Sequence, residues 1–249
     1  MSVIDVHTHL HAGRFDPEII ERGRELGIDL FLCSNIGAFV AHPSLDEVRE
    51  MNRTLVGELA LHPHHLRGYC YVNPRYGADS LDDLRRNVEE HGMIGIKLWI
   101  ATLADDPLCD PILEYAAERR LIVLAHAWRK TVGGFPYEST AVHIAAAARR
   151  HPHTRFVMAH LGGQADSAMN VVRDVPNVAV DTSGTIIHAG EVALAVERLG
   201  ADRVVFGSDL PHVDLSVNVG KVLAAGLDAE QSEKVFGGTV AGWLEAVAR

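Results

Sequence analysis

The chain has 249 residues, close to the roughly 250 that a (β/α)8 barrel typically needs, so we expect one domain spanning residues 1–249. Its hydrophobic fraction of 47% suits a soluble globular protein with a sizeable core. The formal net charge of −10 argues against nucleic acid or an anionic membrane as the main partner. It says little about a small-molecule substrate, which is the partner that we expect.

Short apolar runs alternate along the chain with amphipathic helical patterns. The runs predict eight strands: Val3–His9, Asp29–Ser34, Arg67–Val72, Ile94–Ile100, Leu121–His126, Arg155–His160, Val178–Thr182 and Arg203–Gly207. The patterns between and after them predict helices over Pro17–Leu26, Ser44–His62, Ser80–His91, Pro107–Arg119, Glu138–His151, Gln164–Val172, Ala189–Leu199, Asp214–Ala225 and Ala229–Arg249.

Eight strand–helix units in series indicate an α/β fold of the (β/α)8, or TIM-barrel, type. Parallel strands need crossover helices, these crossovers are right-handed, and eight of them close into a barrel. An open doubly wound sheet is the alternative. That fold usually carries a glycine-rich phosphate loop after its first strand, and this sequence has none there.

Several sequence signals bear on the compartment. The 3 cysteines form no CxxC pair, which disfavours a zinc knuckle or a disulfide framework. The first ten residues lack the basic and apolar regions of a signal peptide. No apolar run approaches the ~18 residues that span a bilayer. We therefore expect a cytoplasmic protein with reduced thiols.

Ionisable residues recur at the carboxyl ends of the predicted strands, where barrel enzymes have their active sites. Burying such groups costs several kcal/mol unless they are paired or ligated, so their recurrence at one end indicates a functional site. They are His7 and His9 in strand one, then Lys97, His126, His160 and Asp209.

The His7-Thr8-His9 segment has the spacing of a metal site. Residues i and i+2 of a strand share a face, so both imidazoles project into the barrel about 7 Å apart at Cα. Two imidazoles at that spacing can reach one ion at Zn–N distances near ~2.1 Å. The other strand-end histidines and the aspartate reinforce this prediction.

Five segments in this order resemble the amidohydrolase superfamily, and most closely its amidohydrolase 2 branch, which includes aminocarboxymuconate-semialdehyde decarboxylase-like enzymes. They are IDVHTH, GIKLW, VLAHAW, FVMAHLGG and VFGSDLPH, and they cover the chain from the first strand to the last. Trp99 departs from the branch, which often shows His-Pro after GIKL, and the chain is short for the branch. The resemblance also implies a homodimer.

The resemblance implies one divalent metal ion, usually zinc, although Mn²⁺ and Fe²⁺ tolerate such ligands. Its ligands would be His7, His9, His126 and Asp209, and His160 would contact the water at the metal. In binuclear relatives a lysine at the position of Lys97 is carboxylated and bridges two ions. The alternative for Lys97 is a buried ammonium paired with an acid such as Asp5.

Such a site supports three hypotheses. The first is a hydrolase that cleaves an amide, lactone or ester of a small molecule with metal-activated water. Asp209 would carry the proton, and His160 would position the water. The alternative is a non-oxidative decarboxylase of a small carboxylated substrate, which protonates the substrate at carbon before CO2 leaves. The third is a metal-free barrel that acts as a lactonase-like enzyme or a binding protein.

Candidate substrate contacts follow the strands. The loop Ala127–Thr140 comes directly after His126, so it is expected to rise over the barrel mouth, either as a lid or as a long surface loop. Arg14 could bind a substrate carboxylate with both guanidinium nitrogens. The other candidates are Trp99, Trp128, Arg129 and His212. Asp181 and Ser183 are interpreted only as capping residues of a strand–helix turn.

Overall fold

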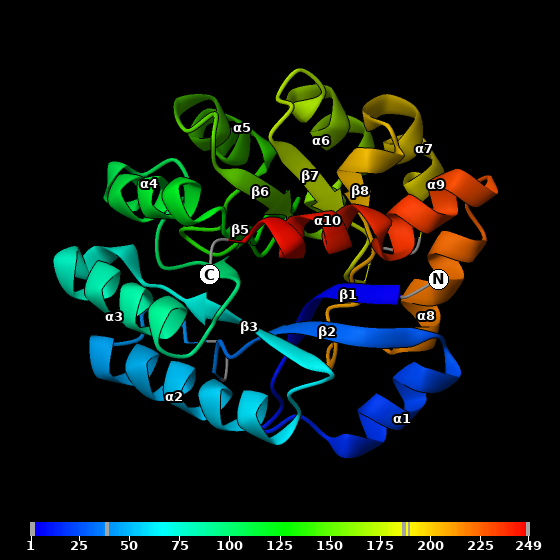
Figure 1. The fold of residues 1–249 in the computed structure, drawn as a ribbon. Coiled ribbons are helices and arrows are strands. Elements are labelled where there is room, and N and C mark those ends of the chain that lie inside the picture. Colours follow the sequence, from blue (N-terminus) through cyan, green and yellow to red (C-terminus); the bar gives the residue numbers. More distant parts are fainter. Residues whose placement is uncertain (1–2, 38–39, 186–187, 189, 248–249) are drawn as a thin grey trace.

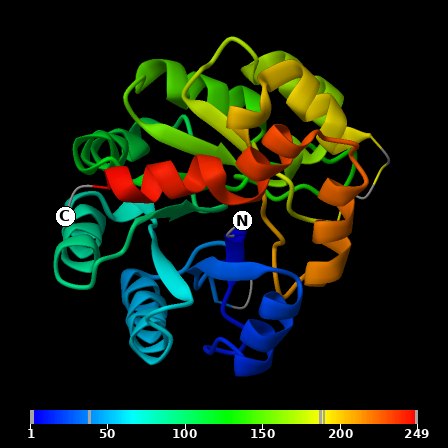
Figure 2. The ribbon, with the colours of Figure 1, turned by 45° about the vertical axis from the view of Figure 1, so that its right-hand side comes forward.

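In the computed structural model, which describes residues 3–37, 40–185, 188 and 190–247, eight parallel strands form one sheet in chain order, as expected for a TIM barrel. This sequential order excludes the open doubly wound alternative, whose strand order reverses part-way. Helices surround the strands (Figures 1 and 2). The strands are β1 Val3–His9, β2 Ile28–Ser34, β3 Leu66–Tyr71, β4 Gly95–Leu98, β5 Ile122–Ala125, β6 Arg155–Met158, β7 Val178–Asp181 and β8 Val204–Val205.

The helices agree with the predicted ones in order. They are α1 Pro17–Glu25, α2 Leu45–Leu61, α3 Ala78–Glu89, α4 Asp110–Arg119, α5 Ala141–Arg150, α6 Ala165–Val172, α7 Glu191–Leu199, α8 Leu215–Leu223, α9 Ala229–Glu233 and α10 Thr239–Ala246. Local caps set several starts: Ser44 and Glu47, for example, form a reciprocal capping box before α2. Over the described ranges, no helix is both long and apolar enough to cross a membrane.

Three of the predicted helices differ most from the observed ones. The helix expected from Glu138 begins at Ala141, which leaves Glu138 in the preceding loop. The helix expected over 107–119 begins with a separate turn of 3-10 helix. The last expected helix is broken by a π-helical turn at Lys234–Gly238, where Gly237 leaves helical geometry. The predicted start of the seventh helix, Ala189, lies outside the described residues.

The barrel closes through the segment that follows β8, which is shorter than predicted. Beyond Val205 this segment runs beside β1: the Val6 amide donates to the Phe206 carbonyl at 3.0 Å, and the Asp209 amide donates to the His7 carbonyl at 2.8 Å. Closure therefore places Asp209 directly beside the HxH segment, although about 200 residues separate them in sequence.

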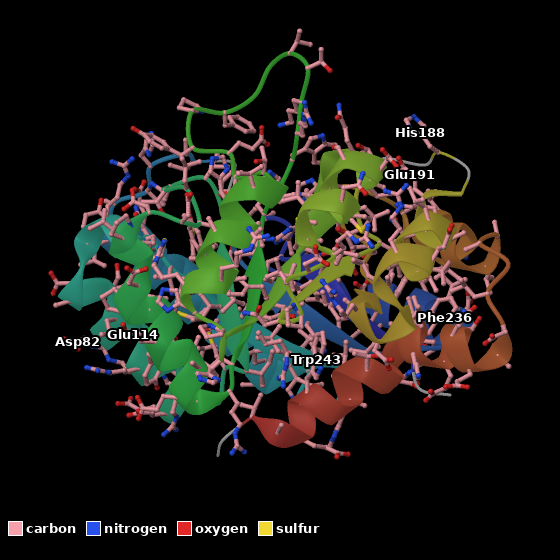
Figure 3. All side chains as sticks on the ribbon, turned by 90° about the horizontal axis from the view of Figure 1, so that it is seen from above. Asp82, Glu114, His188, Glu191, Phe236 and Trp243 are labelled. Carbon is pink, nitrogen blue, oxygen red and sulfur yellow. The ribbon has the colours of Figure 1, made fainter. Side chains whose placement is uncertain are left out.

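Two apolar layers form the core. One lies between the strands and the surrounding helices, and the other fills the barrel interior with residues such as Leu124, Val157 and Val205. The interior layer continues onto α10, whose Val240 is fully buried and whose Trp243 packs against the same cluster. In Figure 3 the red α10 with Trp243 lies at one end of the barrel, and the green loop after β5 projects at the opposite end. α10 therefore covers one end of the barrel, and the loop after β5 stands at the other.

Replacing Gly95 with alanine is expected to destabilise the barrel. A Cβ on Gly95 would lie 2.6 Å from Cδ1 of the buried Tyr69 ring and closer still to the Ile122 carbonyl oxygen. Overpacking of this kind typically costs about 1–3 kcal/mol. The measurement is urea unfolding of Gly95→Ala beside Gly57→Ala, where a Cβ meets nothing within 4 Å and a helical alanine should stabilise slightly. Equal unfolding midpoints for the two variants would contradict the expected packing.

Candidate active site

A cavity of about 260 Å³ lies at the carboxyl ends of the strands. Its floor holds the ionisable residues that the sequence places at these ends, and its upper wall comes from the β5–α5 loop, residues 126–140. The lining residues are His7, His9, Ile36, Lys97, Trp99, His126, Trp128, Lys130, Phe135, His160, Asp209 and His212. A cavity of about 150 Å³ can hold benzene, so this one has room for a single substituted ring.

His7 and His9 meet at the floor as the strand alternation predicts. Their Nε2 atoms lie 3.2 Å apart, and both side chains are buried. Asp209 completes a triangle: its Oδ1 lies 3.6 Å from His7 Nε2 and 3.3 Å from His9 Nε2. Two donors that bind one tetrahedral ion at ~2.1 Å lie about 3.4 Å apart, so these three donor atoms fit one divalent ion.

His160 enters the same floor from a strained turn rather than from a strand. β6 ends at Met158, two residues earlier than predicted, and His160 adopts a left-handed conformation with φ 61°. Non-glycine residues rarely adopt this conformation, which often marks functional sites. Here it turns the ring toward the other donors: His7, His160 and Asp209 each offer an atom within 4.8 Å of the other two.

Asp181 and Ser183, interpreted from sequence only as caps, anchor two of these imidazoles. Asp181 Oδ2 lies 2.8 Å from His7 Nδ1, and Asp181 Oδ1 accepts the backbone amide of His160 at 2.8 Å. Ser183 Oγ lies 2.9 Å from His160 Nδ1. A carboxylate behind a histidine fixes its tautomer and leaves the opposite nitrogen free to bind an ion. The two residues therefore support the site directly.

Burial holds the floor histidines in their neutral, metal-binding form. All four floor histidines have a lowered pKa, and burial is the main cause; they are His7, His9, His126 and His160. The nearby charge of Lys97 lowers the pKa of each ring further. The carboxyl of Asp209 responds in the opposite direction, because burial raises its pKa to about 6 while Lys97 opposes the shift. Neutral imidazoles beside one carboxyl are a donor set that a divalent metal prefers.

Lys97 lies fully buried at the end of β4, and its contact differs from the expected one. Its Nζ is 2.7 Å from His7 Nε2, whereas the acid proposed as its partner, Asp5, accepts the backbone amides of His7 and Ser208. Burial lowers the pKa of Lys97 to about 8, with Asp209 and Asp181 opposing the shift. A lysine with that pKa is readily deprotonated, which the carboxylated role requires, whereas the ammonium role requires the protonated form.

The predicted substrate contacts divide into two groups. Trp99, Trp128 and His212 line the cavity, whereas the side chains of Arg14 and Arg129 are exposed and do not line it. Lys130 and Phe135 also line the cavity, from the loop expected to rise over the barrel mouth, and Glu138 contacts His126 from the same loop, although none of the three was singled out as a site residue. The only sequence signal for them was the position of this loop after a strand-end histidine.

Asp5 is expected to impose a pH dependence on the metal-free fold. Burial raises its pKa to about 7, from an ordinary value near ~3.9, although hydrogen bonds with Ser208 oppose the shift. Between these two values the folded state binds more protons than the unfolded state, so stability should fall as pH rises through this window and level off above it. In chelator, the wild-type melting temperature should therefore drop more steeply from pH 5 to 7.5 than that of Asp5→Asn. Parallel profiles would contradict this assignment.

A family model described as Amidohydrolase matches residues 4–241, which is nearly the whole chain. The chain belongs to the amidohydrolase family. The match covers the HxH segment in β1 and the aspartate after β8, so the residues that gather at the floor all lie within the family's shared region. No protein with a curated function matches the sequence significantly.

Solved structures confirm the fold of this amidohydrolase. The 2,6-dihydroxybenzoate decarboxylase from Rhizobium superposes with a TM-score of 0.82 at 14% identity, covering 98% of each chain. A dihydroxybenzoic acid decarboxylase from Polaromonas, with bound manganese and 2-nitroresorcinol, gives 0.78 at 15% identity over 98% of this chain and 96% of its own. The 5-carboxyvanillate decarboxylase from Sphingomonas paucimobilis gives 0.73 at 18% identity over 92% and 82%.

Proposed function

We propose that this amidohydrolase is a metal-dependent, non-oxidative decarboxylase of a small aromatic carboxylate. The observation that carries the proposal is a cavity with room for one ring, in which aromatic side chains stand over a floor of neutral imidazoles and one protonatable carboxyl. Hydrolysis is the first expectation from sequence. The decarboxylases of the same fold support the sequence alternative instead.

The metal ligands in this proposal are His7, His9 and Asp209, together with His126 as the resemblance implies. His160 stands beside them, its Nε2 3.2 Å from His126 Nδ1. When bound, a divalent ion such as zinc or manganese supplies positive charge that holds and polarises the substrate's oxygen atoms. In this proposal, side chains of the protein orient the substrate and transfer the proton.

In this proposal the aromatic residues of the cavity walls orient the substrate ring. Trp99 and Phe135 meet edge-on with ring centroids 6.5 Å apart, and the ring centroids of Trp128 and His160 lie 4.9 Å apart. Offset or edge-on aromatic packing favours a flat substrate in such a slot.

Asp209 is the proton carrier in this proposal. Its Oδ1 faces His7 and His9, so we assign the proton to Oδ2, and burial favours the protonated form of this carboxyl by raising its pKa. Asp209 gives the proton to the ring carbon that bears the carboxylate. The bond from that carbon to the carboxylate then breaks and CO2 leaves. The electron pair of the broken bond stays on the ring and restores its aromaticity. Solvent reprotonates Asp209.

The test is a substrate panel. The purified protein, loaded in turn with zinc and manganese, is incubated with 2,6-dihydroxybenzoate, 5-carboxyvanillate and other hydroxybenzoates, and CO2 release is measured beside loss of the aromatic acid. Simple lactones, esters and amides form the second arm. We expect stoichiometric CO2 from at least one aromatic acid. Turnover confined to the second arm would replace the proposal with the hydrolase.

A further inference from the structure

Glu138 is a buried carboxylate in the β5–α5 loop that touches the active-site floor. Its side chain is 3% exposed, and its Oε1 lies 2.9 Å from His126 Nε2. The same oxygen lies 2.7 Å from Lys130 Nζ, and Oε2 accepts the backbone amide of Phe135. Thus one carboxylate contacts a floor histidine and two residues that line the upper cavity.

The orientation of His126 sets it apart from its neighbours. His7, His9 and His160 are each anchored through Nδ1, by Asp181, Ser34 and Ser183 respectively. His126 is anchored through the other nitrogen, because Glu138 lies at its Nε2. Its Nδ1 therefore points inward, 3.2 Å from His160 Nε2.

The hydrogen-bond chemistry of this contact fixes the tautomer of His126. An ionised carboxylate only accepts hydrogen bonds, so Nε2 of a neutral ring must carry the hydrogen and Nδ1 must keep its lone pair. Lys130 and His126 keep Glu138 ionised despite burial: burial raises the pKa of Glu138, but its hydrogen bonds to His126 and Lys130 leave it below the ordinary value. Without an acceptor at Nε2, the ring would lose this preference.

We propose that Glu138 is a positioning residue, which holds His126 with Nδ1 as its metal-facing atom and joins the β5–α5 loop to the metal centre. This inference rests on the metal site of the proposed function and extends it to the loop. Because Glu138 also contacts Lys130 and the backbone amide of Phe135, a single side chain joins the fourth ligand to two residues of the cavity wall. Removing it should disturb metal binding and the substrate wall together.

The first test measures metal affinity without any substrate. Zn²⁺ and Mn²⁺ dissociation constants are determined by chelator competition for wild type, Glu138→Ala, Glu138→Gln and Val132→Ala. Loss of a carboxylate behind a ligating histidine costs about 10–100-fold in metal affinity, and we expect this for Glu138→Ala. Glu138→Gln should lose less, since its amide oxygen still accepts from Nε2. Val132, in the same loop and 84% exposed, serves as the matched control and should stay within about twofold of wild type.

The second test reads the tautomer of His126 in the metal-free protein. Long-range ¹H–¹⁵N spectra distinguish the two neutral tautomers, and the His126 signals are assigned by their loss in His126→Gln. We expect hydrogen on Nε2 in wild type and a shift toward the other tautomer in Glu138→Ala. Hydrogen on Nδ1 in wild type, or unchanged metal affinity in a folded Glu138→Ala, would overturn the proposal. If wild-type protein binds no metal, the proposed function is wrong instead. The tautomer of His126 would then still decide whether Glu138 positions that ring.

Discussion

Asp209→Asn is expected to lower kcat by about 10²–10⁴-fold on the acid that wild type decarboxylates, while the fold is retained. An amide cannot carry the proton that we assign to the buried carboxyl of Asp209, whose pKa burial raises. Asparagine has nearly the same shape, and the backbone amide of residue 209 still bonds to the His7 carbonyl, so the turn after β8 should persist. The measurement is steady-state CO2 release, with circular dichroism to confirm folding.

Asp82→Asn provides the matched control for this prediction. Asp82 lies on α3, its side chain is 65% exposed, and it is paired only with Arg85 among the contacts of the described residues. The same change of charge there should leave kcat unaltered, because surface ion pairs contribute little. A wild-type rate for Asp209→Asn would remove Asp209 as the proton carrier.

His9→Ala is expected to release most of the bound metal. His9 Nε2 is one of three donor atoms that lie 3.2–3.6 Å apart, and its Nδ1 contacts Ser34 Oγ at 2.8 Å, so the ring is held in place for this role. Loss of a direct ligand should exceed the roughly 10–100-fold effect of losing an outer partner. The measurement is metal content by plasma mass spectrometry, on protein purified without chelator or a His-tag. Full metal retention in this variant would rule out His9 as a ligand.

The same measurement on wild type counts the ions. About one per chain would support the mononuclear site, and nearly two would indicate that Lys97 is a carboxylated bridge and His160 a ligand. The control is His188→Ala, because His188 is 81% exposed on the loop after β7 and should not affect metal content. No metal in wild type, even after reconstitution, would favour the metal-free barrel.

The sequence alone determined the order of the elements and the outline of the floor. Alternating apolar runs and helical patterns are local properties, and eight repeats of them admit one closed arrangement. The rule that barrel sites lie at the carboxyl ends of strands then selects His7, His9, Lys97, His126 and Asp209, all of which line the cavity. Period-two alternation also correctly predicted that the two histidines of β1 share a face.

Only the tertiary structure decided which residues hydrogen-bond to the floor histidines and which loop side chains line the cavity above them. Asp181 contacts His7 across 174 positions of sequence, and no local pattern records such a contact. Glu138 has the pattern of a helix start, yet its side chain folds back onto His126 because a buried imidazole and Lys130 offer it partners there. Arg14 follows β1 as a substrate contact would, but its turn directs it to solvent. Strand ends are fixed by local periodicity, whereas loop side chains are placed by the hydrogen bonds that the closed barrel makes available.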